Sequence, residues 1–117
     1  MKAQIYDPYY KNKKPLKKII MPRPEDVNPQ AFTVIDVLYN HDDFAISYGV
    51  WNETGDSCLA MRWNNADDGN GYPKVFAHPQ WFIISNDIAR NILTGILNNP
   101  IVTNLEYSRI LTALTIL

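Results

Sequence analysis

The first half of the chain alternates apolar and polar residues with the two-residue period of a β-strand. Residues 31–39 (AFTVIDVLY) and 44–51 (FAISYGVW) are rich in β-branched and aromatic residues, and residues 40–43 (NHDD) are typical of a turn. A third stretch, residues 57–63 (SCLAMRW), follows a glycine-containing turn. This pattern predicts an antiparallel meander of three strands.

Side-chain alternation predicts which residues of each strand face the core. In the second strand these are Phe44, Ile46, Tyr48 and Val50. In the first strand we expect the core face to be Thr33, Ile35, Val37 and Tyr39, with Asp36 in solvent. In the third strand Leu59, Met61 and Trp63 share one face, and Cys58, Ala60 and Arg62 share the other.

After the third strand the pattern breaks and then changes its period. Residues 64–74 (NNADDGNGYPK) give no secondary-structure signal, whereas residues 75–78 and 80–84 predict short strands. From Ser85 or Asn86 onward, apolar residues recur at the helical spacing. A second helix is predicted from the capping box formed by Thr103 and Glu106.

These elements predict an α+β fold, namely an antiparallel β-meander of four to five strands followed by two C-terminal helices packed on one face. The chain has 117 residues, which favours one domain. We divide it into a basic, proline-rich N-terminal arm (residues 1–30) and a single α+β domain (residues 31–117).

The composition also predicts the cellular compartment of the protein. The chain has one cysteine, Cys58, so it cannot form an intramolecular disulfide, which is typical of a reducing compartment. The first residues contain no apolar segment of a secretory signal, and no apolar run approaches the ~20 residues of a membrane span. We therefore expect a cytoplasmic protein without a membrane span.

Charge is distributed unevenly along the chain. Residues 1–24 contain seven basic residues and one acidic residue, whereas the remainder contains four basic and eleven acidic residues. Four alternatives follow: the arm lies across its own acidic domain or across a dimer partner, contacts another protein, binds nucleic acid through its lysines and Tyr6, Tyr9 and Tyr10, or has no binding role. Nucleic acid is the weakest of these alternatives because the domain offers no matching basic face.

Residues that could perform acid–base catalysis gather around the long loop. Asp67, Asp68, Arg62 and His78 could form the site of a small hydrolase or isomerase. A solvated loop is the favoured explanation of the two aspartates, and pairing of Cys58 with His78 as a thiolate is less plausible than a buried structural thiol. No motif indicates a metal site or a cofactor.

Aromatic residues offer a different interpretation. Three tryptophans and seven tyrosines exceed what one small core takes, so some of them should line a pocket or a protein interface. We assign Trp63, Arg62, Tyr72 and Trp81 to such a rim.

The pattern GVW…G…LAMRWN…GYPK…HPQWF resembles small bacterial proteins carried on mobile elements, and no residue role follows from that resemblance. The sequence thus favours a non-enzymatic binding module, such as an inhibitor, immunity-type or adaptor protein. Its partner would be a protein or a small apolar or aromatic ligand. We expect a homodimer formed through the apolar last helix or the arm.

Overall fold

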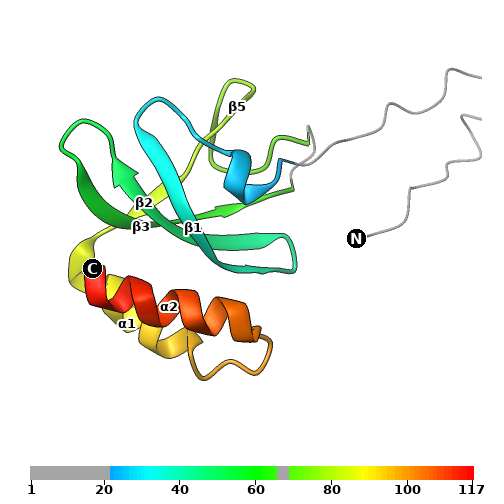
Figure 1. Cartoon of the computed structure of the whole chain (residues 1–117). Coiled ribbons are helices and arrows are strands. Elements are labelled where there is room, and N and C mark those ends of the chain that lie inside the picture. Colours follow the sequence, from blue (N-terminus) through cyan, green and yellow to red (C-terminus); the bar gives the residue numbers. More distant parts are fainter. Residues whose placement is uncertain (1–21, 66–68) are drawn as a thin grey trace, which may run out of the picture.

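The computed structural model describes residues 22–65 and 69–117 and contains one four-stranded antiparallel sheet (Figure 1). Its strands lie in the order β1 (Phe32–His41), β2 (Phe44–Trp51), β3 (Asp56–Trp63) and β6 (Phe82–Ile84). Two helices follow, α1 (Asn86–Ile96) and α2 (Asn104–Ile116). The predicted α+β fold is confirmed.

Both helices cover the same face of the sheet. Ala89 and Leu93 of α1 and Ile110 and Ala113 of α2 are fully buried. They pack against sheet residues Leu38, Ile46, Tyr48, Leu59 and Ile84. This apolar layer forms the larger of the two hydrophobic clusters in the described chain.

The opposite face of the sheet carries a second, smaller cluster that neither α1 nor α2 covers. Trp81 and Val27 lie over it; Val27 follows the short 3-10 helix η2 (Pro24–Asp26). The Trp81 Nε1–H donates a hydrogen bond of 2.7 Å to the Val27 carbonyl, and the Trp81 ring lies 5.9 Å from that of Phe32. A proline-containing segment and one tryptophan therefore close this side of the sheet.

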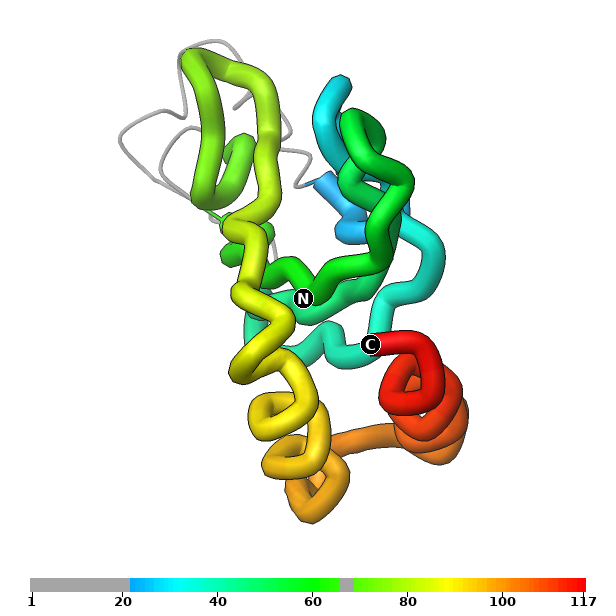
Figure 2. The backbone as a smooth tube through the Cα atoms, turned by 90° about the vertical axis from the view of Figure 1, so that its left-hand side faces the viewer, coloured from blue at the N-terminus to red at the C-terminus, as the bar shows by residue number. Residues whose placement is uncertain are grey.

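A short hairpin extends from the sheet, away from the helices. It contains β4 (Lys74–Val75) and β5 (His78–Pro79), which form a separate two-stranded sheet. Figures 1 and 2 both show this hairpin and the helices at opposite ends of the molecule.

The predicted core face of the first strand is wrong. Ile35 is 49% exposed, whereas Phe32 and Leu38, which were predicted to face away from the core, are buried. The register of β1 against β2 shifts between Val34 and Asp36 and again between Val37 and Tyr39. Each shift inserts one extra residue into β1, so that the side chains after it point to the face opposite the one that simple alternation predicts. Phe32 consequently joins the Trp81 side, and Leu38 the helix side.

The predicted helix starts are confirmed. The Ser85 hydroxyl accepts a hydrogen bond from the Asp87 amide, and Thr103 and Glu106 form the complete capping box. Within the described ranges, no helix has the length and apolar character needed to cross a bilayer.

The arm is described only from residue 22 onward. Its final segment contributes Val27 to the second cluster, while residues 1–21, which carry all of its lysines and all three of its tyrosines, lie outside the described residues. The division of the chain at residue 30 stays a prediction.

Candidate binding surface

Arg62 is the largest fully buried side chain of the described chain, with 1% of its surface exposed. It lies on β3 opposite Ala45 of β2, whose small side chain leaves room for the guanidinium. Nε donates a hydrogen bond to Asn64 Oδ1 (3.3 Å), Nη2 donates to the Asn70 carbonyl (2.7 Å), and Nη1 donates to the Gln80 carbonyl. All three of its nitrogens are therefore bonded.

The charge of Arg62 is compensated in an unusual way. No carboxylate of the described residues lies within ion-pair distance of it, and its acceptors are neutral oxygens. The Trp81 ring centroid lies 5.9 Å from the guanidinium carbon, within cation–π range. Burial lowers the pKa of Arg62 to about 10, so the side chain stays charged at neutral pH.

The bonds of Arg62 hold both ends of the projecting hairpin. Asn70 precedes the hairpin and Gln80 follows it, so one guanidinium fixes the incoming and the outgoing chain. Gly71 makes this approach possible: its φ is +74°, and a Cβ at this position would collide with Arg62 Nη2 and the Trp63 carbonyl. The guanidinium therefore contacts the backbone directly.

Exposed aromatic side chains lie next to this clamp. Trp63 and Tyr72 form an isolated antiparallel bridge with reciprocal backbone hydrogen bonds of 2.7 and 2.9 Å, which places their side chains on the same side. Trp63 is 47% exposed and Tyr72 is 66% exposed. Phe82, which is 62% exposed, lies opposite Met61, the residue two positions before Trp63 on the same face of β3.

Phe44 completes this surface. Its ring meets that of Trp63 edge-on at a centroid distance of 4.8 Å. We call Phe44, Trp63, Tyr72 and Phe82 the aromatic patch.

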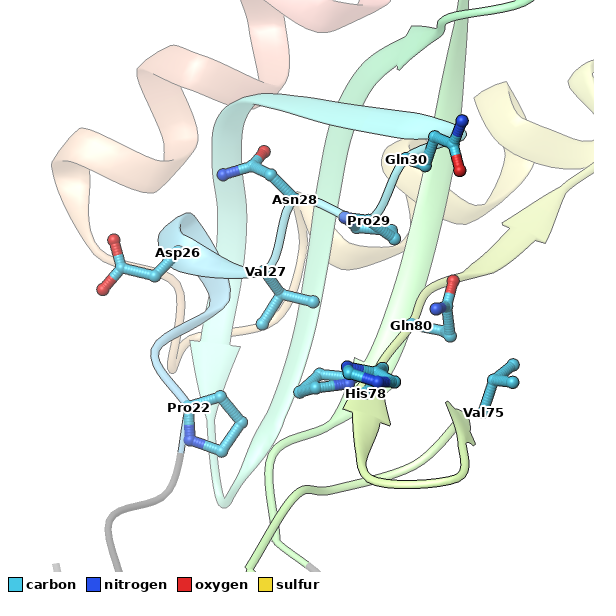
Figure 3. Close-up of a pocket in the computed structure, with 10 residues that line it drawn as sticks. Pro22, Asp26, Val27, Asn28, Pro29, Gln30, Val75, His78 and Gln80 are labelled. Carbon is cyan, nitrogen blue, oxygen red and sulfur yellow. The ribbon is translucent and has the colours of Figure 1, made fainter.

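A groove of about 410 Å³ separates the hairpin from the segment around η2. Figure 3 shows Pro22 and Val27 on one side of it and His78 on the other. Its polar lining includes Gln30 and Gln80, so the groove combines apolar walls with a few hydrogen-bonding groups. It is open and shallow in comparison with the enclosed sites that bury most of a small ligand.

The structure separates the predicted site residues into two levels. Trp63 and Tyr72 are exposed, whereas Arg62 and Trp81 are buried on the opposite face of the sheet. Their assignment to a binding rim stays a prediction, but only Trp63 and Tyr72 are available for contact with a partner.

The proposed catalytic group is not assembled within the described residues. Asp67 and Asp68 lie outside them, His78 is exposed on β5, and the nitrogens of Arg62 are bonded to carbonyl and carboxamide oxygens. Cys58 is buried, and this burial, together with the charge of Asp56, raises the pKa of its thiol. Across residues 22–65 and 69–117, no cluster of histidine, cysteine and acidic side chains could hold a metal ion. The acid–base interpretation stays a prediction.

Sequence reasoning missed Phe82 as a surface residue. Adjacent strand residues point to opposite faces, so Trp81 and Phe82 could not both be buried on one side. This alternation was the available signal, but it does not show which of the two residues is covered. The Trp81–Val27 hydrogen bond decides it.

No family model matches the chain, and no curated protein or solved structure shows significant similarity to it.

Proposed function

We propose that this protein is a non-enzymatic binding module that contacts a partner protein through the aromatic patch. The observation that carries the proposal is the exposure of Trp63, Tyr72 and Phe82, at 47, 66 and 62%, on the side of the sheet that carries Met61. Large exposed apolar patches are uncommon on monomers and mark interaction sites.

The chemistry of the patch favours a protein over a small ligand. Tyrosine and tryptophan supply large contact areas with few rotatable bonds and are enriched in the residues that dominate protein interfaces. Trp63 is braced by Phe44, and the backbone of Tyr72 is fixed by its bridge, so little conformational entropy is lost on binding.

The remaining expectations belong to the same proposal. We propose a bacterial, cytoplasmic protein that forms a homodimer. The single, buried Cys58 supports a reducing compartment, and the partly exposed apolar residues of α2, Leu105, Leu111 and Ile116, support a dimer contact.

The proposal is tested with a double variant, Trp63→Ser with Tyr72→Ser, compared with Ile35→Ser. Ile35 is 49% exposed at the other edge of the sheet, so it matches Trp63 in exposure but lies outside the patch. Each immobilised chain is incubated with an extract of the cells that encode it, and any retained protein is purified and its affinity measured.

We expect the double variant to weaken binding of the purified partner at least tenfold while Ile35→Ser changes it less than threefold. Circular dichroism spectra of the three chains establish that each is folded. Equal affinity for the wild type and the double variant contradicts the proposal.

A further inference from the structure

Phe76 occupies the tip of the hairpin that Arg62 holds, between β4 and β5. It is 89% exposed, the highest value among the large apolar side chains of the described chain, and the preceding Val75 is 54% exposed. Neither residue belongs to a hydrophobic cluster or has a ring contact within the described residues. The apolar surface at this tip therefore belongs to neither core cluster of the described residues.

The backbone of Phe76 is also strained. Its φ is +54°, in the left-handed region where the Cβ of an L-residue approaches the carbonyl oxygen. Glycine, asparagine or aspartate occupies such turn positions at lower steric cost. A bulky residue that is held in this conformation, and that packs into neither hydrophobic cluster of the described residues, points to a role outside the fold.

The hairpin holds the backbone of Phe76 in place. The Gln80 amide donates a hydrogen bond of 2.9 Å to the Pro73 carbonyl and closes the base, and Arg62 bonds the Gln80 carbonyl from beneath. Pro73 and Pro79 each fix one backbone dihedral of the two arms. A preorganised tip of this kind loses little entropy when it is bound.

We propose that Phe76 is an anchor that inserts into an apolar pocket on a partner protein, with Val75 packing at the rim of that pocket. This inference rests on the proposed binding function. It adds that Phe76 is the residue that enters the partner and that the partner has an apolar pocket to receive it. A projecting side chain requires a concave partner, and buried aromatic anchors of this kind dominate the affinity of protein interfaces.

Charge favours a protein pocket over a lipid surface. Residues 25–117 contain eleven acidic and four basic side chains, and the hairpin from Pro73 to Gln80 carries one basic residue, Lys74. Loops that bind anionic membranes place several basic residues beside their apolar tip. The acidic body of this protein would be repelled by such a surface.

The experiment places a photoreactive phenylalanine analogue, p-benzoylphenylalanine, at position 76 of the full chain, and at position 35 as the control. After irradiation in the cells that encode the chain, the adduct is identified and the captured protein is purified. Its affinity is then measured for the wild type, Phe76→Gly and Phe76→Leu.

Phe76→Gly suits this test because glycine accepts the left-handed backbone without strain, so the variant keeps or gains thermal stability. We expect an adduct with a different protein from position 76 and none with that protein from position 35. We further expect affinity to fall at least tenfold in Phe76→Gly and by less than about fivefold in Phe76→Leu, which keeps an apolar side chain.

Several results overturn the inference. These are the absence of an adduct at position 76, an adduct only with a second copy of this chain, unchanged affinity of Phe76→Gly for the captured protein, and Phe76-dependent sedimentation with vesicles of phosphatidylcholine and phosphatidylglycerol. If Trp63→Ser with Tyr72→Ser abolishes binding and Phe76→Gly does not, only this inference fails. If neither change affects binding, the proposed function fails as well.

Discussion

The protein buries two opposite charges on two sides of its sheet, Glu106 on the helix side and Arg62 on the hairpin side. Glu106, at the start of α2, accepts hydrogen bonds from the amides of Asn40 (2.9 Å) and Thr103 (3.0 Å), and His41 Nε2 lies 2.6 Å from its Oε1. Arg62 donates to two carbonyls and one carboxamide. Each side chain joins segments that are far apart in the sequence.

The surroundings of the two charges differ. On the side of Glu106, Leu93 of α1 and Ile110 of α2 are completely buried in the core between the helices and the sheet. In the segment that Arg62 holds, between Asn70 and Gln80, Tyr72 and Phe76 are more than half exposed. The first charge helps to assemble the domain, whereas the second supports a segment that the domain displays.

Leu93→Ala tests the helix side most severely. Leu93 is completely buried between helix and sheet, and its truncation leaves a cavity, so we expect a loss of about 4 kcal/mol in unfolding free energy. Urea denaturation measures the loss. In the fraction that remains folded, NMR chemical shifts of Tyr72 and Phe76 should stay unchanged, and large shifts there would show that the two sides are not independent.

Arg62→Met tests the hairpin side. Methionine fills much of the space but leaves the Asn70 and Gln80 carbonyls without their donor, so we expect a loss of about 3 kcal/mol. Hydrogen exchange of the hairpin amides should accelerate more than that of the helices. The matched control is Arg109→Met, which removes a partly exposed arginine bonded to the Val37 carbonyl and should cost at most about 1 kcal/mol. Equal losses in the two variants would contradict the clamp.

Glu106→Gln tests the contribution of the Glu106 carboxylate to stability, which should depend on pH. Burial alone would raise the pKa of Glu106, but hydrogen bonds from His41 and from the Thr103 and Asn40 amides outweigh it and hold the pKa below its ordinary value of 4.5. A lowered pKa means that the carboxylate stabilises the folded state above its unfolded pKa, and that this contribution disappears as the pH falls through the folded value.

We therefore expect Glu106→Gln to cost about 2 kcal/mol at pH 7 and much less at pH 3. Urea denaturation at both pH values measures the difference. Glu53→Gln in an exposed turn is the control and should change stability by less than about 0.5 kcal/mol. A cost that is equal at both pH values would rule out the carboxylate charge as its cause.

Ser47→Ala gives the smallest effect and the opposite sign. The Ser47 hydroxyl is fully buried and has no hydrogen-bond partner among the described residues. Its removal relieves an unsatisfied polar group, so we expect stability to rise by up to about 1 kcal/mol. A measured loss of stability would indicate that the hydroxyl has a bonding partner.

Much of the fold followed from sequence because local patterns dictated it. The strands centred on Ile46 and Leu59 and the capping box of Glu106 are set by alternation and helix-start chemistry. The faces of β1 could not be predicted, since bulges depend on the partner strand.

The candidate site was less predictable because it depends on contacts across the fold. The sequence placed Arg62 among small residues. Two of its acceptors are main-chain carbonyl oxygens eight and 18 positions later, and they could not be predicted because every residue carries such a group. The exposure of Phe82 and Phe76 likewise depends on which segments cover the sheet and on the hairpin turn.

The acceptors of Arg62 at the base of the hairpin have one more consequence. Because both acceptors are main-chain oxygens, their hydrogen bonds to Arg62 do not depend on which side chains residues 74–78 carry. Those positions can diverge during evolution, or be exchanged by an engineer for another recognition sequence, without altering how the insert is fastened. The stability of the fold should therefore be insensitive to substitutions within that span and fall sharply on substitution of Gly71, where the main chain itself meets the guanidinium.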